Sequence, residues 1–361
     1  MKVVRQGEGG GRSMKWSEGM VKLIELSSMV ADEKLEKTGM FGVLHFFDDG
    51  WVWGSNGFFE FELYCGSEFN VSVPASKFYD VMKVLDPKLA YEVWVDGGHF
   101  VVTGEGVQVK LNVVQSDGVV NRITSLLKSD GSGLKGVQVD WSSDVLKVLK
   151  REEKVASSGS SALEYRVICF DRQGIFATDR VRIACYFAPF IVGEEKVLLS
   201  VSGVKQLVRV AEDAQLEAAW VVGDKLCAKF GGGLYVGVLG YDMDYPKLGE
   251  VLSGYKEKVE VMSVDMLVTD EISRIIKILD PSDVVYLVVD GGWLELKVNS
   301  LRGFEWGKKL QKVPVDGHYE VGVLARDLDG VIDGVVELGF SDNVVYCKSV
   351  EGVEYVIATI S

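Results

Sequence analysis

The sequence lacks a long apolar run and has no excess of basic residues. No stretch approaches the roughly 20 consecutive apolar residues that a membrane-spanning helix needs, and residues 1–13 are polar and glycine-rich, unlike a secretion signal. We therefore expect no membrane association. The 53 acidic residues outnumber the 39 Lys and Arg residues, and the net charge is −14. This balance excludes an ordinary DNA-binding module, so any contact with nucleic acid would need a locally basic face.

Histidine and cysteine are scarce, and their spacing matches no metal site. None of the three histidines or five cysteines lies in an HExxH or CxxC spacing. The odd number of scattered cysteines, mostly inside apolar runs, indicates buried free thiols and therefore a reducing compartment, so we expect a cytoplasmic protein.

No pattern of a nucleotide-binding or catalytic site is present either. The glycine clusters at residues 9–11 and 231–233 lack the GxxxxGK[ST] pattern of a phosphate loop, and we interpret them as a loose tail and a hairpin turn. Carboxylate pairs such as Asp48–Asp49 and Glu152–Glu153 are interpreted as solvated surface pairs. The sequence therefore predicts no cofactor, no metal and no enzymatic activity.

What the chain does contain is one pattern that occurs three times. A short strand leads into an amphipathic helix at residues 14–16 and 18–30, at 137–141 and 144–154, and at 259–262 and 264–279. Ser17, Ser143 and Ser263 precede these helices, and we expect them to cap the first turns.

Each helix is followed by the same series of elements. Turns rich in acid and glycine open hairpins at residues 48–55, 171–178 and 290–295. Strand-to-helix junctions follow at 71–77, 199–205 and 321–326, with helices of about two or three turns, and three-stranded meanders start at 93–95, 219–221 and 336–338. The polar stretches 115–136 and 253–258 are interpreted as linkers.

This pattern predicts an α+β fold of three repeated domains, each with two helices on about eight strands of antiparallel sheet. The predicted limits are residues 14–127 for the first domain, 137–254 for the second and 255–361 for the third. Residues 128–136 would form a linker, and residues 1–13 a flexible tail.

Several short strings then suggest a family. They are Val73-Pro74-Ala75-Ser76-Lys77-Phe78, Ala177-Thr178-Asp179 followed by Arg182-Ile183-Ala184, Tyr245-Pro246-Lys247-Leu248 with Val251-Leu252, and Tyr355-Val356-Ile357. Each string is weak by itself, but in this order and at these intervals the chain resembles the bacterial DNA polymerase III beta sliding clamp from residue 14 to residue 360.

The resemblance implies three DNA-clamp domains per chain and a head-to-tail homodimer that forms a closed ring, with helices around a central hole and sheets outside. Its partners would be double-stranded DNA, held topologically and without sequence preference, a replicative DNA polymerase and a clamp loader. Encirclement needs little phosphate affinity, which reconciles a DNA role with the acidic net charge.

The best local signal of function is a basic helix face. Lys147, Lys150, Arg151 and Lys154 recur at helical spacing, opposite the apolar Val145, Val148 and Leu149. The plainer interpretation is a solvated face on a core helix, whereas under the clamp interpretation these cations face DNA backbone phosphates. Further DNA-facing candidates on the other helices are Lys22, Lys77, Lys83, Lys205, Arg209, Arg274, Lys277 and Arg326.

The resemblance also implies a groove for linear peptide motifs of polymerases and loaders, between the second and third domains. Carried over by position, its residues are Thr178, Arg182, Ile183, Pro246, Val251, Val356, Ile357 and Ile360. For the apolar members the alternative is plain core packing.

Two departures from the family affect this groove. Arg180-Val181 stands where the family usually has Gly-His, and the chain ends Ala358-Thr359-Ile360-Ser361 instead of in a Met-Pro-Met-Arg-Leu-like tail. Both favour a divergent clamp, of the kind that would serve a phage or plasmid replisome.

Two alternatives to a clamp stay open from the residues. The main one is a non-enzymatic, triplicated β-rich structural or binding protein without a nucleic-acid role, and a hydrolase with an unrecognised carboxylate pair has less behind it. The basic stripe at residues 147–154 distinguishes the first from a clamp, because it would face open solvent instead of a closed bore.

Overall fold

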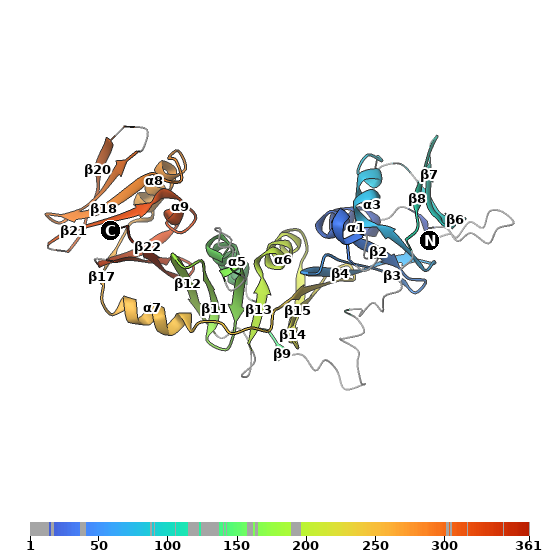
Figure 1. Ribbon diagram of the computed structural model, residues 1–361, viewed down its shortest axis with the longest axis horizontal. Coiled ribbons are helices and arrows are strands. Elements are labelled where there is room, and N and C mark those ends of the chain that lie inside the picture. Colours follow the sequence, from blue (N-terminus) through green and yellow to red (C-terminus); the bar gives the residue numbers. More distant parts are fainter. Residues whose placement is uncertain are drawn as a thin grey trace. The chain divides into compact units, whose positions relative to one another are not determined.

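Figure 1 shows the computed structural model of the chain, which is built from antiparallel sheets with helices on their faces. It describes residues 14–15, 18–36, 41–86, 89, 91–104, 106–114, 123, 137–139, 141, 143–156, 162, 165–188, 196–300, 303, 305–315, 317–341 and 343–360. The chain forms two compact units, one of residues 1–139 and 202–241 and one of residues 140–201 and 242–361.

The first unit has one sheet of eight strands and one of four. The larger sheet contains, in spatial order, β5 (Val71–Pro74), β2 (Val43–Phe46), β3 (Gly50–Ser55), β4 (Phe59–Ser67), β16 (Leu234–Leu239), β15 (Lys225–Phe230), β14 (Leu216–Val222) and β9 (Val137–Gln138). The smaller sheet contains β1 (Met14–Lys15), β6 (Glu92–Asp96), β7 (His99–Gly104) and β8 (Val107–Asn112). Its helices are α1 (Glu18–Val30), α2 (Glu33–Glu36), α3 (Ala75–Met82) and nearly all of α6 (Val201–Asp213).

The second unit repeats this plan. Its eight-stranded sheet contains β13 (Val197–Ser200), β10 (Val167–Phe170), β11 (Gly174–Thr178), β12 (Arg182–Phe187), β24 (Val353–Ala358), β23 (Val344–Ser349), β22 (Val335–Ser341) and β17 (Glu260–Ser263). The four-stranded sheet contains β20 (Glu305–Lys312), β19 (Trp293–Asn299), β18 (Val284–Asp290) and β21 (His318–Leu324). Its helices are α5 (Ser143–Ala156), α7 (Leu248–Lys256), α8 (Met266–Ile276) and α9 (Ala325–Leu328).

Apolar side chains on the inner faces of these sheets form the cores. In the first unit α1 packs on α3, β3 and β4, and the ring of Phe46 lies 5.0 Å from Phe100 and 6.0 Å from Phe78. In the second unit α5 covers one face of β10, β11 and β12, and α7 packs on β11, β12, β23 and β24. Figure 1 shows α5 and α7 on opposite sides of these strands. Alternating side chains of a strand point to opposite faces, so both faces of this sheet are covered.

The predicted α+β architecture is confirmed. In the described part of the chain the first repeat supplies β1 to β8, the second β9 to β16 and the third β17 to β24, eight strands each as expected. The predicted tail at residues 1–13 and the linker at 128–136 lie outside the described residues, and the three domain limits stay a prediction.

The first helices of the repeats lie where the sequence predicts them, but one cap is wrong. Ser143 is the first residue of α5, and its capping role stays a prediction. Ser263 ends β17, and the cap of α8 is Asp265, whose carboxylate accepts a hydrogen bond from the Leu267 amide at 2.8 Å. A carboxylate two residues nearer the first turn takes the place of the serine hydroxyl. Ser17 lies outside the described residues.

The predicted linker at residues 253–258 is also wrong, because residues 253–256 belong to α7. Leu248 and Leu252 are buried one helical turn apart, and this apolar pair holds the helix on the sheet. The second helices also vary more than predicted: α3 has 8 residues, α6 has 13 and α9 has 4. No helix in the described residues is long and apolar enough to span a membrane.

Candidate peptide-binding and DNA-facing surfaces

The predicted peptide groove lies entirely in the second unit, and strand register decides which of its residues share a face. Thr178 in β11 pairs with Ile183 in β12, and Ile183 pairs with Val356 in β24. Directly opposed residues of antiparallel strands point to the same face. The structure therefore brings Thr178, Ile183 and Val356 together.

Helix α7 covers this face. Gly249, in its first turn, lies so close to the sheet that a side-chain carbon there would be 3.2 Å from Phe187 and 3.5 Å from Phe176. Phe187 lies four positions after Ile183 in β12, and Phe176 lies two positions before Thr178 in β11. Strand side chains an even number of positions apart point to the same face, so all four share it. Val251 is exposed on the same helix, and Pro246 is exposed just before it.

Arg182 and Ile357 are not brought to this face. They pair with each other and point to the α5 side of the sheet. Arg182 is 1% exposed; its guanidinium lies 3.0 Å from the Asp179 carboxylate and donates to the Lys154 carbonyl at 3.0 Å. Arg182 therefore fixes the end of α5 to the sheet beneath the groove. Ile357 is completely buried.

The C-terminal segment completes the rim. The Ala358 amide donates to the Val181 carbonyl at 2.8 Å, and the Ile360 amide donates to the Gly322 carbonyl at 2.8 Å. The side chains of Val181 and Ile360 are exposed. Ala358 therefore lies beside the β11–β12 turn, and Ile360 lies beside β21.

A cavity that sequence reasoning missed adjoins this face. It has a volume of about 580 Å³ and lies between β10, β11 and the segment that leads into α7; its lining includes Phe176, Tyr245, Pro246 and Leu248. Cys169 also lines it, and burial raises the pKa of this thiol to about 12, so it stays protonated. The only signal in the sequence is the Tyr-Pro-Lys-Leu string at residues 245–248, which the resemblance already singled out.

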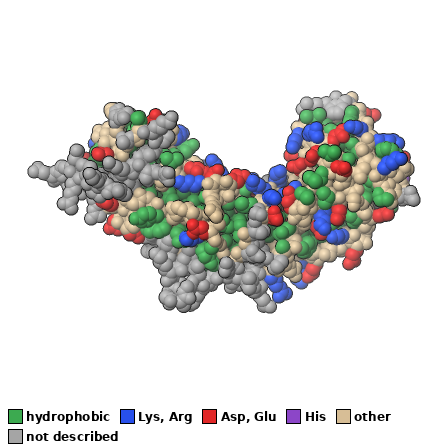
Figure 2. Space-filling view, turned by 180° about the vertical axis from the view of Figure 1, so that it is seen from behind, with side chains coloured by type: hydrophobic (Ala, Val, Ile, Leu, Met, Phe, Trp, Pro, Cys, Tyr) green, Lys and Arg blue, Asp and Glu red, His purple; other side chains and the backbone are tan. Residues whose placement is uncertain are grey.

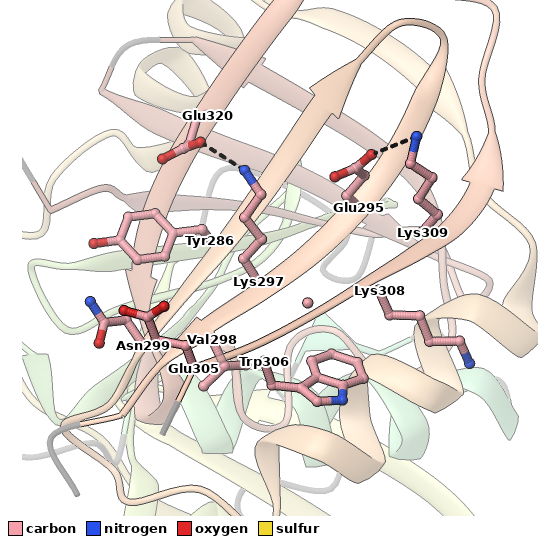
Figure 3. Close-up of a pocket in the computed structure, with 11 residues that line it drawn as sticks. Tyr286, Glu295, Lys297, Val298, Asn299, Glu305, Trp306, Lys308, Lys309 and Glu320 are labelled. Carbon is pink, nitrogen blue, oxygen red and sulfur yellow. Dashed lines mark hydrogen bonds and ion pairs between the residues drawn. The ribbon is translucent and has the colours of Figure 1, made fainter. Parts of the chain in front are cut away.

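A second cavity, of about 680 Å³, lies on the four-stranded sheet of the second unit, where β20 is an edge strand (Figure 3). Its charged side chains are paired across strands: Lys297 lies 3.3 Å from Glu320, and Lys309 lies 3.3 Å from Glu295. Gly307 also lines this cavity. The ion pairs leave little charge for a ligand, so this cavity is a hollow beside a strand edge.

On α5 the predicted basic stripe has its expected placement, with one exception. Lys147, Lys150 and Lys154 are exposed, and Val148 is buried on the opposite side. Arg151 differs, because only 13% of its side chain is exposed. It forms a 2.8 Å ion pair with Glu351 and donates to the Asp333 carbonyl at 2.7 Å. Arg151 is therefore held within the protein.

The other DNA-facing candidates are surface residues with nearby acids. In the first unit Lys22 pairs with Glu25 at 2.9 Å, Lys77 with Glu33 at 3.5 Å and Lys83 with Asp80 at 2.6 Å, while Lys205 and Arg209 are exposed on α6. In the second unit Arg274 and Lys277 are exposed at the end of α8, and Arg326 lies 3.7 Å from Asp327. Figure 2 likewise shows basic and acidic side chains intermingled on the face it displays. The potential of these helices is therefore only moderately positive.

Glu152 corrects the interpretation of the Glu152–Glu153 pair as solvated. Its side chain is completely buried, and neither carboxylate oxygen has a hydrogen-bond partner. Burial raises the pKa of this carboxyl group well above its usual value. The reason is helical spacing: position 152 follows the buried Val148 and Leu149 by one turn and precedes the buried Val155.

The described residues contain no group of three or more His, Cys, Asp or Glu side chains that could hold a metal ion. Ser72 and His45 lie 2.8 Å apart and have the composition of a nucleophile and a base, but both are buried in the sheet, His45 against Trp53. A substrate has no access to them.

Comparison with known proteins identifies the fold. No protein-family model and no curated protein sequence matches the chain. Solved structures match it over nearly its whole length. A putative DNA polymerase III beta subunit from Eubacterium rectale has a TM-score of 0.79 at 13% identity, covering 97% of this chain and 99% of its own.

Two further similar structures are clamps from other bacteria. The DNA polymerase sliding clamp of Caulobacter crescentus has a TM-score of 0.79 at 16% identity, with 97% of this chain and 99% of its own covered. A Pseudomonas aeruginosa sliding clamp bound to griselimycin has a TM-score of 0.76 at 15% identity, with 98% and 100% covered. The chain therefore has the fold of the bacterial DNA polymerase III beta sliding clamps.

Proposed function

We propose that this chain is a DNA sliding clamp, a non-enzymatic processivity factor that closes into a homodimeric ring around duplex DNA and binds peptides of a polymerase and a clamp loader. Three clamp domains, with the limits predicted from the sequence, would make up each copy. A clamp keeps the polymerase near its template by raising its effective concentration, so no chemistry at the clamp is required.

The proposal rests on a strand pairing between successive repeats. This pairing occurs twice within the chain, and the two strands that remain for a third pairing lie at sheet edges. The fourth strand of the first repeat, β4, pairs with the eighth strand of the second, β16. In the same way β12, the fourth strand of the second repeat, pairs with β24, the eighth strand of the third. The corresponding unmatched strands are β8 and β20, and both are sheet edges. Pairing β20 of one copy with β8 of the next repeats the junction head to tail.

Both open edges carry exposed apolar side chains. Val107 is exposed on β8 and Trp306 on β20. Val84, just after α3, is 74% exposed, and Ile278, just after α8, is 82% exposed. An unpaired strand edge with exposed apolar residues is a surface that soluble proteins normally cover. A second copy covers both edges at once.

The weakly basic helices fit retention by encirclement. Lys147, Lys150 and Lys154 would contact backbone phosphates without reading bases, and their modest number would let the ring slide. The ring would need a loader to open it. Such a protein would act in the cytoplasm, at the replisome.

The peptide site would be the α7-covered face with Thr178, Ile183, Val251 and Val356. Apolar grooves of this kind take anchor side chains of linear peptides. One similar Caulobacter crescentus structure is described with polyethylene glycol bound to a putative beta-motif tethering region. Arg182 would support this site from below, through the turn that it fixes.

The test is retention on DNA. Labelled protein is loaded on a nicked circular plasmid with ATP and the clamp loader of its source cells, and bound protein is separated by gel filtration. We expect retention that survives high salt and is lost when the plasmid is cut once. Light scattering over a concentration series should give a dimer. A persistent monomer with equal, salt-sensitive binding to both DNA forms would refute the clamp and favour a β-rich structural protein.

The basic stripe is tested in the same assay. Replacing Lys147, Lys150 and Lys154 together with Ala should leave the dimer intact and reduce the yield of loaded DNA at low salt, because three phosphate contacts are removed. Unchanged loading would mean that this face is only a solvated helix surface.

A further inference from the structure

One residue of the β11–β12 turn adopts a backbone conformation that its side chain disfavours. Arg180 has φ = 81°, in the left-handed region, and it is the one residue other than glycine with a positive φ in the described part of the chain. The turn enforces this conformation, because Asp179 accepts hydrogen bonds from the amides of Val181 and Arg182 at 3.0 and 2.7 Å. Glycine would fit here without strain. Strain of this kind often accompanies function, which directs attention to the side chain.

The guanidinium is held over an aromatic ring. It lies 4.5 Å from the ring centroid of Tyr165, which precedes β10. Stacking uses the flat face of the guanidinium and leaves its N–H groups free at the edge. Arg180 is exposed, and among the described residues its guanidinium forms no hydrogen bond or ion pair besides this stacking on Tyr165. A planar, oriented and unpaired guanidinium is suited to bind a carboxylate through two hydrogen bonds.

Arg180 lies at the border of the proposed peptide site, which indicates the kind of ligand that its guanidinium would bind. Its amide donates to the Thr178 hydroxyl at 3.3 Å, and Thr178 belongs to the α7-covered face. The exposed Val181 and Ile360 lie on the same rim. An apolar site therefore has an oriented cation at its border. A peptide carboxylate beside an apolar anchor would be attracted to it.

We propose that Arg180 is a specificity-determining residue that binds a carboxylate of the peptide in the groove, so that this chain selects segments with an acidic residue beside their apolar anchors. The proposal rests on the peptide-binding function proposed above. Tyr165 acts as a positioning residue, because its ring orients the guanidinium. The Gly-His that the resembling family usually carries at this turn offers no such contact.

The test uses the full-length protein and a synthetic array of eight-residue peptides with two adjacent apolar residues. Each peptide is made with Asp and with Asn at every other position. We expect wild-type protein to favour the Asp member at one position by about tenfold to a hundredfold, the range of a hydrogen-bonded charge pair. Arg180→Gln and Arg180→Gly should remove this preference while still binding the Asn peptide. Arg180→Lys should restore only part of it, since lysine lacks the planar fork.

Controls separate this role from a structural one. Arg166→Gln removes the same charge from an exposed position next to Tyr165 and should leave the Asp preference unchanged. Arg180→Gly should unfold at the same or a higher temperature than wild type, because it relieves the backbone strain.

The outcomes distinguish the two proposals. If peptides bind but Asp and Asn members bind equally, or if Arg180→Gly keeps the preference, the role assigned to Arg180 is wrong. The proposal that the groove binds peptides would be unaffected. If no peptide binds wild-type protein, the proposed groove fails and this inference fails with it.

Discussion

Glu152 and Arg182 show how the second unit treats buried charge in two ways. Arg182 has an acidic partner and two carbonyl acceptors on α5, whereas Glu152 has no hydrogen-bond partner. Removing a buried charge that has partners, as in Arg182, leaves those partners unsatisfied. A buried carboxyl group without partners, as in Glu152, is costly to ionise. The two residues should therefore respond in opposite directions to substitution.

Glu152→Gln should stabilise the protein at neutral pH. Burial raises the pKa in the folded state above the value of about 4.5 in the unfolded chain, so folding takes up a proton between the two values. Wild-type stability is therefore lost as the pH rises above the unfolded pKa, and the variant lacks this loss. We expect a gain of roughly 1–3 kcal/mol at pH 7.5 and much less at pH 4.5, measured by urea unfolding. An equal difference at both pH values would contradict this account.

Arg182→Ala should destabilise the second unit by about 3–5 kcal/mol, because it removes a buried ion pair and the contacts to Lys154 and Val155. Thermal unfolding followed by circular dichroism measures the loss. Arg180→Ala, two residues away and exposed, is the matched control and should change stability little. Wild-type stability of Arg182→Ala would show that the residue is not structural.

Residue-scale prediction from the sequence was limited by register and by helix phase. Alternation along a strand places Arg182 and Ile183 on opposite faces, but the sequence does not show which face α5 covers and which face α7 covers. The burial of Glu152 can be predicted from the sequence, because its spacing from Val148 and Leu149 places it on the apolar side of α5. The adjacent Glu153 makes the two residues resemble a solvated acidic pair instead.

At the scale of elements, the repeated strand junction explains why the chain has unmatched edges. Helix α8 lies beside one of these edges, since its Glu271 forms an ion pair with Lys308 of β20. Ile278 follows this helix and is among the most exposed apolar side chains of the described residues. An apolar residue beside an open strand is suited to an interface core.

Ile278→Asp should convert the dimer to a monomer without lowering thermal stability, because the side chain is exposed in a single copy and a carboxylate there would be buried without a partner in the interface. Size-exclusion chromatography with light scattering measures the mass. Val350→Asp, at an exposed apolar position in the β23–β24 turn, is the control and should stay dimeric. If both variants dimerise like wild type, Ile278 lies outside the interface.

Elements were predicted well where the sequence repeats and poorly where it does not. The turns of acid and glycine and the alternating strands recur in three copies, so each copy supports the others. Helix α7 lies outside the repeated pattern recognised in the sequence, and the polar stretch 253–258, which overlaps the end of this helix, is predicted as a linker. The apolar pair that anchors it, Leu248 and Leu252, lies just before that stretch.

For the whole molecule, encirclement reconciles the acidic net charge with the proposed role on DNA. A ring of paired repeats needs cations only to guide a duplex and not to hold it, which agrees with lysines that have acids nearby. The likeness to solved clamps at 13–17% identity supports the fold that this requires. Closure of the proposed ring is the step on which every other part of the proposed function depends.

Cross-linking of the two edges tests this closure most directly. Cysteines are introduced at Gln108 in β8 and Gly307 in β20, where a side-chain carbon meets only ordinary contacts, and a flexible bis-maleimide is added. All five native cysteines are buried and should not react. The account predicts a covalent dimer and no larger product, with no dimer from either single variant. A ladder of larger species would show open chains, and unlinked monomer would contradict the ring.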